Sequence, residues 1–189
     1  AAGLGGTHLH AEGRLFPVRI THVGDRPPDR QELVERVEQA LTRAANDPGD
    51  VLVFLPGKGE IHAVYERLAP RRDITTLTLH GGLTLDEQAR VFEPAQKRKV
   101  ILCTNVAETS LTVPGVGVVI DSGLVRRTRY HQGRGFLTLM PIADDSAEQR
   151  AGRAGRTAPG VCYRLWSQAT RLAPATPPAT APDSRARSA

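Results

Sequence analysis

The sequence has few cysteines, few aromatic side chains and no long apolar run. Two Cys in 189 residues exclude a small protein held together by disulfides. No segment approaches the roughly 20 apolar residues that a membrane-spanning helix needs, and no secretory signal is visible. We therefore expect a cytoplasmic protein that makes no contact with a membrane. Aromatic residues make up 4%, which is too few for a broad base-stacking platform.

Metal-ligating residues are also sparse. The six His show no ligand spacing, so we predict no zinc or other metal site in this chain. Cys103 and Cys162 each lie in an apolar strand, which is typical of buried free thiols.

Composition indicates one folded domain with loose ends. Apolar residues make up 40% and charged residues 24%, so the chain as a whole is not disordered. We expect a flexible flank over residues 1–12, a domain over 13–168, and a disordered tail rich in Ala, Pro, Thr and Arg over 169–189. The 25 Lys and Arg against 20 Asp and Glu give a formal charge of +5, which permits a nucleic-acid partner without demonstrating one. The first residue is not Met, so we expect a fragment or a processed chain.

Short apolar runs alternate with helical patterns along the domain. The predicted strands are 51–55, 76–79, 100–103 and 116–120, and the predicted helices follow a cap at Asp29, span Ile61 to Leu68, and begin at the capping box Thr84–Glu87. Strands that are apolar throughout, alternating with helices, predict an α/β fold with a parallel sheet covered on both faces. Residues 125–130 and 136–140 are strand-like and flank a Gly-containing turn, which predicts an inserted β-hairpin. Its arginines are Arg126, Arg127, Arg129 and Arg134.

The segment Gln149-Arg150-Ala151-Gly152-Arg153-Ala154-Gly155-Arg156 carries the strongest functional signal. On one helix, Gln149, Arg153 and Arg156 share a face, and planar guanidinium groups on one face suit a triphosphate. Gly152 and Gly155 each cost about 1 kcal/mol in a helix relative to Ala, and they allow a close approach to another backbone. The alternative is a solvated helix that begins at a Ser146 capping box and ends at Gly155.

Several separated stretches together resemble one protein family. They are residues 52–57 with Glu60-Ile61, residues 80–83 with Gln88 and 91–95, residues 104–112 with 114–116 and 118–123, and residues 149–156. These stretches resemble the motifs of the second RecA-like domain of DEAH-box helicases of superfamily 2, over roughly residues 13–166. Within that family, residues 121–124 and 161–166 are most similar to bacterial HrpB-type helicases.

The resemblance implies a RecA-like lobe of the P-loop NTPase type with an inserted hairpin. Such a helicase would hydrolyse ATP with Mg²⁺ in the cleft between two lobes while it moves along RNA. DNA stays open as the partner, because contacts to the backbone carry little base information.

The resemblance also implies roles for individual residues around the nucleotide. Arg153 and Arg156 would act as arginine fingers and Gln149 would position the attacking water, whereas Arg150 would be structural. The implied nucleotide-binding residues are Phe92 on the adenine, Ser110, Asp121 near the ribose, and Gly152. For Phe92 an ordinary core position on a helix is the alternative. Asp121 ends an apolar strand, and the carboxyl ends of such strands line ligand clefts.

Polar residues after the strand at 100–103 are predicted to bind nucleic acid. Short hydroxyl and amide groups beside free backbone N–H groups suit a phosphate backbone. The predicted nucleic-acid set is Thr104, Asn105, Thr109, Gly57, Lys58, Arg126 and Arg134. The alternatives are a turn with local hydrogen bonds, a flexible helix start and a merely solvated hairpin.

Two motifs of a complete ATPase are missing. The chain has no G-x-x-x-x-G-K-[ST] loop and no Asp-Glu-Ala-His run, which hold the phosphates and Mg²⁺. In the family both belong to the first RecA-like lobe. We therefore expect that lobe and the following helical domains as partners, with the Mg²⁺ ligands on the first lobe and an isolated chain that does not hydrolyse ATP. The alternatives are a non-catalytic nucleic-acid-binding or regulatory module and, more weakly, a phosphate-binding protein that needs no P-loop.

Overall fold

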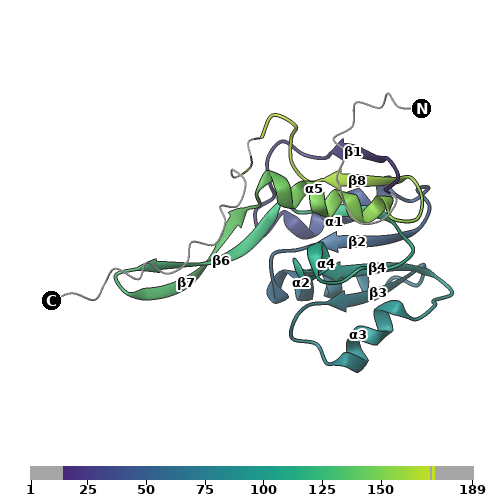
Figure 1. The fold of residues 1–189 in the computed structure, drawn as a ribbon, viewed down its shortest axis with the longest axis horizontal. Coiled ribbons are helices and arrows are strands. Elements are labelled where there is room, and N and C mark those ends of the chain that lie inside the picture. The colour runs from purple at the N-terminus through teal and green to yellow at the C-terminus, as the bar shows by residue number, and fades with distance from the viewer. Residues whose placement is uncertain (1–14, 171, 173–189) are drawn as a thin grey trace.

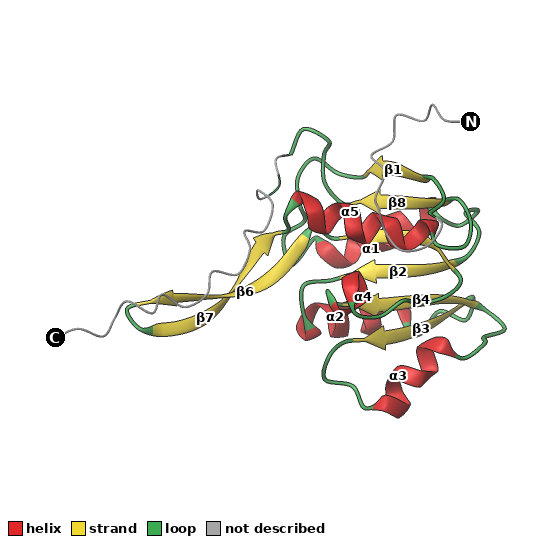
Figure 2. Ribbon diagram, viewed as in Figure 1, coloured by secondary structure: helices red, strands yellow, loops and turns green. Residues whose placement is uncertain are grey.

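The computed structural model describes residues 15–170 and 172. They form a sheet of six strands with helices on both faces, and a separate hairpin of two strands (Figures 1 and 2). In chain order the elements are β1 (Val18–His22), α1 (Leu33–Arg43), β2 (Asp50–Phe54), α2 (Lys58–Leu68), β3 (Ile74–Leu79), α3 (Leu85–Phe92), β4 (Arg98–Cys103), α4 (Val106–Thr109), β5 (Val116–Asp121), β6 (Leu124–His131), β7 (Arg134–Pro141), α5 (Asp144–Gly152), the 3₁₀ helix η1 (Arg153–Gly155) and β8 (Gly160–Arg164). The predicted flank over 1–12 and most of the predicted tail over 169–189 lie outside the described residues.

The strand order of the sheet is β1-β8-β5-β2-β4-β3, and all of its strands run parallel. The carboxyl ends of the central strands align, since Phe54 at the end of β2 pairs with Cys103 of β4 and Asp121 of β5. Pairing continues one residue further, where the N–H of Thr104 donates to the carbonyl of Leu79 at 3.3 Å. The segments that follow β2, β3, β4 and β5 therefore lie side by side along one edge.

The sheet separates two apolar layers, which confirms the predicted α/β fold. Val51, Val53 and Leu55 pack with the α1 and α2 residues on one face, whereas Leu52 and Phe54 pack with residues of α3, α4, α5 and η1 on the other. A strand buried on both faces has no solvated side, so its sequence is apolar at every position.

The helix starts follow the predicted polar signals. At α3, the Thr84 hydroxyl accepts from the N–H of Glu87 at 3.2 Å, and the Glu87 carboxylate accepts from the N–H of Thr84 at 2.8 Å, so the capping box is confirmed. Asp29 accepts hydrogen bonds from the N–H groups of Gln31 and Glu32 in the turn before α1. The N-cap of α1 itself is Glu32, which makes no side-chain cap, so the predicted Asp29 cap lies one turn ahead of the helix. These side chains satisfy N–H groups that have no partner inside a helix.

The structure corrects three sequence-based expectations. β1 was not predicted as a strand, and its half-exposed residues at the edge of the sheet leave a weaker apolar pattern than a central strand does. Residues 149–156 are not one helix, because α5 ends at Gly152 and tightens into η1. Ser146 lies inside α5, whose N-cap is Ala143, so the alternative capping box at Ser146 is wrong.

Gly155 lets η1 lie directly against the chain before β1. The N–H of Phe16 donates to the carbonyl of Gly155 at 2.8 Å, and a Cβ at Gly155 would lie 2.5 Å from the Phe16 carbonyl oxygen. We expect Gly155→Ala to lower the free energy of unfolding by about 1–3 kcal/mol, because a backbone atom cannot yield as a flexible side chain can. Urea denaturation would measure this loss. Gly81→Ala is the matched control, since its Cβ would find its nearest neighbour at 3.8 Å, and equal stability of the two variants would contradict the prediction.

Candidate nucleotide and nucleic-acid site

The carboxyl edge of the sheet gathers most of the predicted nucleic-acid residues. Gly57 and Lys58 follow β2, while Thr104 and Asn105 follow β4, and the hairpin begins two residues after β5. Because β2 lies between β4 and β5, these three segments are neighbours. Lys58, Asn105 and Thr109 are exposed and Thr104 is half-buried. The structure thus places these residues on two neighbouring segments, the loop and first turn of α2 after β2 and the loop and short helix α4 after β4.

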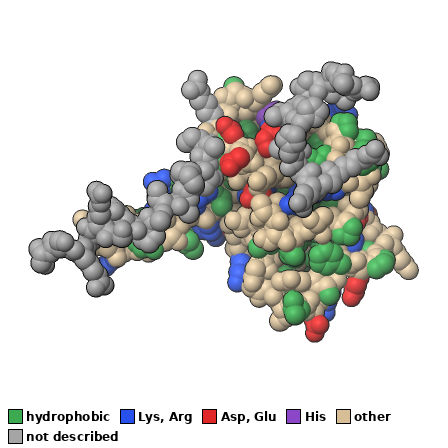
Figure 3. All heavy atoms as spheres, in the orientation of Figure 1, with side chains coloured by type: hydrophobic (Ala, Val, Ile, Leu, Met, Phe, Trp, Pro, Cys, Tyr) green, Lys and Arg blue, Asp and Glu red, His purple; other side chains and the backbone are tan. Residues whose placement is uncertain are grey.

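The hairpin projects from this edge well beyond the sheet (Figures 1 and 2). Its strands β6 and β7 pair over their full length, around a turn in which Gln132 and Gly133 have φ angles of 50° and 76°. Lys and Arg side chains are visible along the hairpin in Figure 3. Arg134 lies exposed beside this turn, and the ring of Tyr130 on the opposite strand is 79% exposed. The arm therefore presents both cationic and aromatic groups to solvent.

Arg126 at the root of the hairpin differs from the other hairpin arginines. Its guanidinium donates to the Glu60 carboxylate at the start of α2, and its side chain is 28% exposed. A Cβ at Gly57 would lie 2.9 Å from Arg126 Nε, so Arg126 also lies across the loop after β2. Arg126 thus already has an anionic partner inside the chain, and its direct contact with nucleic acid stays a prediction.

Arg153 and Arg156 lie close together at the end of α5. The Arg153 side chain donates twice to the Glu108 carbonyl, from Nε at 2.9 Å and from Nη2, and donates from Nη1 to the Thr112 hydroxyl at 3.1 Å. Burial lowers the pKa of Arg153, and the charge of Arg156 lowers it further. Within residues 15–170 and 172, Arg156 has no carboxylate partner, and its Nε is buried without a hydrogen bond. Two neighbouring cations with so little internal compensation suit a multiply charged anion.

Gln149 and Gly152 belong to the same helix. The side chain of Gln149 is exposed on α5, and Gly152 is half-buried at its end. Ser110 is exposed directly after α4, on the loop that leads to Thr112. The predicted arginine finger Arg153 therefore contacts the short segment from Glu108 to Thr112, which overlaps the residues predicted to bind nucleic acid.

Arg150 is a buried structural residue, as predicted. Its side chain is 1% exposed, Nη1 donates to Asp121 Oδ1 at 2.8 Å, and the Phe54 ring centroid lies 4.9 Å from its guanidinium carbon. Its Nε lies 3.3 Å from a carboxylate oxygen of Glu108, which is an ion pair without a hydrogen bond. Arg150 thus joins the end of β5 to α4 across the interior.

Asp121 lies deeper than the predicted ribose contact would need. It is fully buried, and its Oδ1 accepts from both Arg150 and the N–H of Gly123 at 2.9 Å. The other oxygen, Oδ2, is buried without a partner. Its contact with a ribose stays a prediction, and this burial does not favour it.

Phe92 is 41% exposed at the end of α3, so the alternative of an ordinary core residue is wrong. Lys99 holds this end of the helix, because its Nζ donates to the carbonyls of Val91 at 2.8 Å and Glu93 at 2.9 Å. α3 packs on β3 and η1 packs on β5, with β2 and β4 between them. At about 4.8 Å per strand, β3 and β5 lie roughly 14 Å apart across the sheet, so a ligand that touches both α3 and η1 must be elongated.

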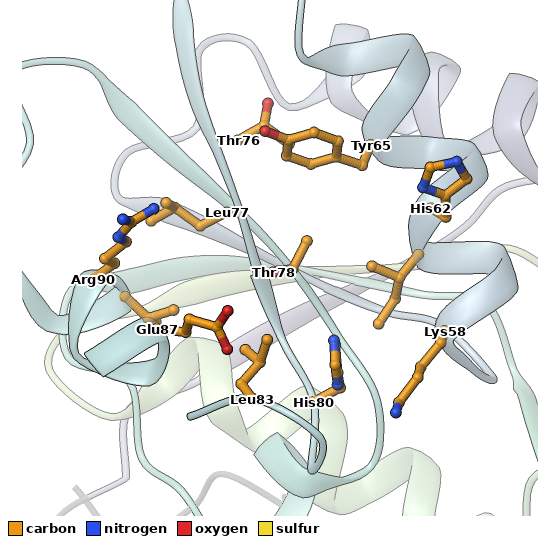
Figure 4. A pocket seen from close by; sticks show the side chains of 12 residues that line it. Lys58, His62, Tyr65, Thr76, Leu77, Thr78, His80, Leu83, Glu87 and Arg90 are labelled. Carbon is orange, nitrogen blue, oxygen red and sulfur yellow. The ribbon is translucent and has the colours of Figure 1, made fainter. Parts of the chain in front are cut away.

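A groove of about 440 Å³ runs beside the edge strand β3, between α2 and α3 (Figure 4). At its carboxyl end, a Cβ on Gly82 would lie 2.5 Å from Lys58 Nζ. Burial lowers the pKa of His80 in this groove, and the charge of Lys58 lowers it further, which favours the neutral imidazole. One ring nitrogen then accepts from the N–H of Gly82 at 3.1 Å. The groove continues the predicted nucleic-acid edge towards β3.

Three residues with a clear structural part in the site had no role assigned from the sequence. Glu60 and Glu108 stand inside the recognised stretches, but their partners come from β6 and α5. Lys99 lies in an otherwise apolar strand, and because a buried lysine needs hydrogen-bond partners, its position was the one sequence signal that could have indicated such a partner.

The described residues contain no helix that is long and apolar enough to cross a bilayer. They contain no group of three or more His, Cys, Asp or Glu that could hold a metal ion. Cys103 and Cys162 are buried free thiols, as predicted, and burial raises the pKa of both.

The parallel sheet, the motif residues on α5 and η1, and the polar loops at the carboxyl edge together define a RecA-like domain of the helicase type. The family described as "Helicase conserved C-terminal domain" matches residues 32–158, and this chain belongs to it. This match and the similar proteins described next confirm the predicted fold and the resemblance to DEAH-box RNA helicases.

Solved structures of E. coli HrpB are similar to this chain. The structure of the DExH-box NTPase HrpB is 36% identical, with a TM-score of 0.75, and covers 82% of this chain and 20% of its own. A second structure, of the E. coli DEAH/RHA helicase HrpB, is 36% identical, with a TM-score of 0.73, and covers 83% of this chain and 21% of its own.

Curated relatives are much longer than this chain. The ATP-dependent RNA helicase DEAH11, chloroplastic, of Arabidopsis thaliana is 41% identical over 172 residues, which cover 85% of this chain and 10% of the relative. The probable ATP-dependent RNA helicase DHX35 homolog of Caenorhabditis elegans is 39% identical over 184 residues, which cover 90% of this chain and 25% of the relative. The chain thus spans between a tenth and a quarter of these relatives.

Proposed function

We propose that this chain is the second RecA-like lobe of an ATP-dependent RNA helicase, where it supplies arginine fingers to ATP hydrolysis and backbone contacts to single-stranded RNA. The observation that carries the proposal is the pair formed by Arg153 and Arg156 at the end of α5. Arg156 has no carboxylate partner among the described residues, and Arg153 is 7% exposed, with a pKa that burial and the charge of Arg156 lower.

The residues on this face fit a nucleoside triphosphate. Guanidinium groups stabilise the negative charge that grows on the γ-phosphate during transfer, and they do so best where water is excluded. Gln149 is exposed one turn before Arg153, so its amide can orient a water molecule. The exposed ring of Phe92 offers a flat apolar surface for a base. Mg²⁺ bound by the first lobe would neutralise phosphate charge on the opposite side of the cleft.

The carboxyl edge fits a nucleic-acid backbone. Thr104, Asn105 and Thr109 offer short polar groups, and Lys58 adds a cation on the neighbouring loop. Contacts of this kind bind phosphate and sugar and carry little sequence information. The partners that the proposal requires are single-stranded RNA, the first RecA-like lobe and the helical domains that follow in longer relatives.

A fusion that places this chain between the first RecA-like lobe and the following helical domains of E. coli HrpB would test the proposal. We expect the fusion to hydrolyse ATP, single-stranded RNA to stimulate that hydrolysis more than single-stranded DNA does, and the 189-residue chain alone to be inactive. A folded fusion that binds ATP but does not hydrolyse it, with or without RNA, would contradict the proposal. RNA binding by the chain in the absence of any ATPase activity would indicate the non-catalytic module instead.

A further inference from the structure

Glu60 is a buried carboxylate at the root of the hairpin. It lies on the first turn of α2 and is 2% exposed. Its Oε1 accepts from Arg126 of β6 and lies 3.7 Å from Arg30 Nε. Its Oε2 is buried without a hydrogen-bond partner.

Such a carboxylate depends on its partner. Burying a charge is costly, and removing one member of a buried ion pair leaves the other without compensation. Arg30 is a weak substitute, because its side chain is 70% exposed and its nitrogen is further away. Arg126, at 28% exposed, is therefore the main counter-charge of Glu60. This dependence ties β6 to α2.

The root of the hairpin has a second fixed point on its other strand. The N–H of Ile142, just after β7, donates to the carbonyl of Gly123 at 2.9 Å. Trp166 packs so closely on Gly123 that a Cβ there would lie 2.7 Å from its ring. Val125 and Ile142 also pack with Trp166 in one apolar cluster, and the ion pair with Glu60 adds a separate restraint that further limits the motion of the arm.

The other hairpin arginines are arranged differently. Arg127, Arg129 and Arg134 are exposed, and none of them has a carboxylate partner within residues 15–170 and 172. Arg126 is thus committed to the body of the domain, whereas the remaining cations face solvent. Arg126 therefore serves to hold the arm, whereas the exposed arginines remain available to a ligand.

We propose that Glu60 is a positioning residue that holds the hairpin, through Arg126, at a fixed angle to the Gly57–Lys58 loop. The Cβ that Gly57 lacks would meet Arg126 Nε at 2.9 Å, so the same arginine touches both the loop and the arm. Loss of the Glu60 carboxylate frees the arm to sample other directions. The consequence for RNA rests on the proposed function, whereas the orientation of the arm does not.

Spin labels on the 189-residue chain would test the orientation directly. Cys103 and Cys162 are buried, so labels attach at cysteines introduced at Leu137 on the hairpin and Glu66 on α2, both of which are exposed. We expect a narrow distance distribution in the parent chain and one at least about twice as broad in Glu60→Gln. Arg126→Gln should broaden it equally, and Arg30→Ala is the matched control that should leave it narrow. A narrow distribution in folded Glu60→Gln and Arg126→Gln would overturn the proposal.

Exchanging the two charges distinguishes loss of the ion pair from a general loss of stability, because only the former would be reversed by the exchange. The double variant Glu60→Arg with Arg126→Glu restores an ion pair in the reverse sense, and we expect it to narrow the distribution relative to either single variant. In the helicase fusion, Glu60→Gln should slow RNA unwinding about tenfold or more while ATP hydrolysis changes less than twofold. A fusion without ATPase activity would refute the proposed function alone, because the distance measurement needs neither ATP nor RNA.

Discussion

Replacement of Arg156 by Ala is expected to lower kcat for RNA-stimulated ATP hydrolysis in the two-lobe enzyme by about 10³- to 10⁵-fold. Arg156 is the cleaner test of the two fingers, because the described residues offer it no carboxylate partner. Arg153 in contrast holds the Glu108 carbonyl and the Thr112 hydroxyl, so its loss would also disturb the loop between α4 and β5. Steady-state kinetics that separate kcat from KM would measure the effect.

Two further variants make the Arg156 experiment decisive. Arg156→Lys keeps the charge but loses the planar fork, and we expect most of the rate loss to persist. Arg72→Ala removes an exposed arginine elsewhere on the surface and should leave kcat unchanged. An Arg156→Ala enzyme with normal kcat and a raised KM would show that this side chain binds nucleotide without acting in the transition state.

The second large effect is expected at Arg150, where Arg150→Met should lower the free energy of unfolding by about 3–5 kcal/mol. The methionine retains apolar volume, but Asp121 and Glu108 would both lose their buried counter-charge. Urea denaturation of the 189-residue chain, followed by circular dichroism, would measure the loss. Because the effect arises from carboxylates left uncompensated, the double variant Arg150→Met with Asp121→Asn should recover part of it.

A surface ion pair provides the control for Arg150. Arg71 and Asp73 form two hydrogen bonds, but their side chains are 40% and 62% exposed. Solvent screens such a pair, so Arg71→Ala should cost no more than about 1 kcal/mol. If Arg150→Met cost no more than Arg71→Ala, the buried network would contribute little to stability.

The central strands could be predicted from the sequence because both faces of each strand are buried. Residues 51–55, 100–103 and 116–120 are apolar at nearly every position, and no other local pattern explains such runs. The edge strand β1 is half-exposed and was missed for that reason. The end of α5 was extended too far, because helical spacing alone does not show where the chain must tighten to lie against β1.

The ionic contacts of the site depend on tertiary pairing and could not be predicted in the same way. Glu60 and Arg126 are 66 positions apart, and Asp121 and Arg150 are 29 positions apart. Their proximity follows from the strand order and the register, which no local pattern contains. Motif position predicted segments that lie near one another in the structure, whereas only the structure shows that Arg126 and Arg150 are ion-paired within the domain and Arg127, Arg129 and Arg134 are exposed.

The strand order also has a consequence for the synthesis of the protein. Of the strands that the structure describes, β1 is translated first, and its sole neighbour in the sheet is β8, which is translated last. Val18 pairs with Gly160, so about 140 further residues must be translated before this edge can close, which takes roughly 7 to 28 s at ordinary elongation rates. Once β5 has formed, the edge that will pair with β8 stays open until β8 is translated, and the nascent chain exposes an unpaired strand edge that chaperones could recognise.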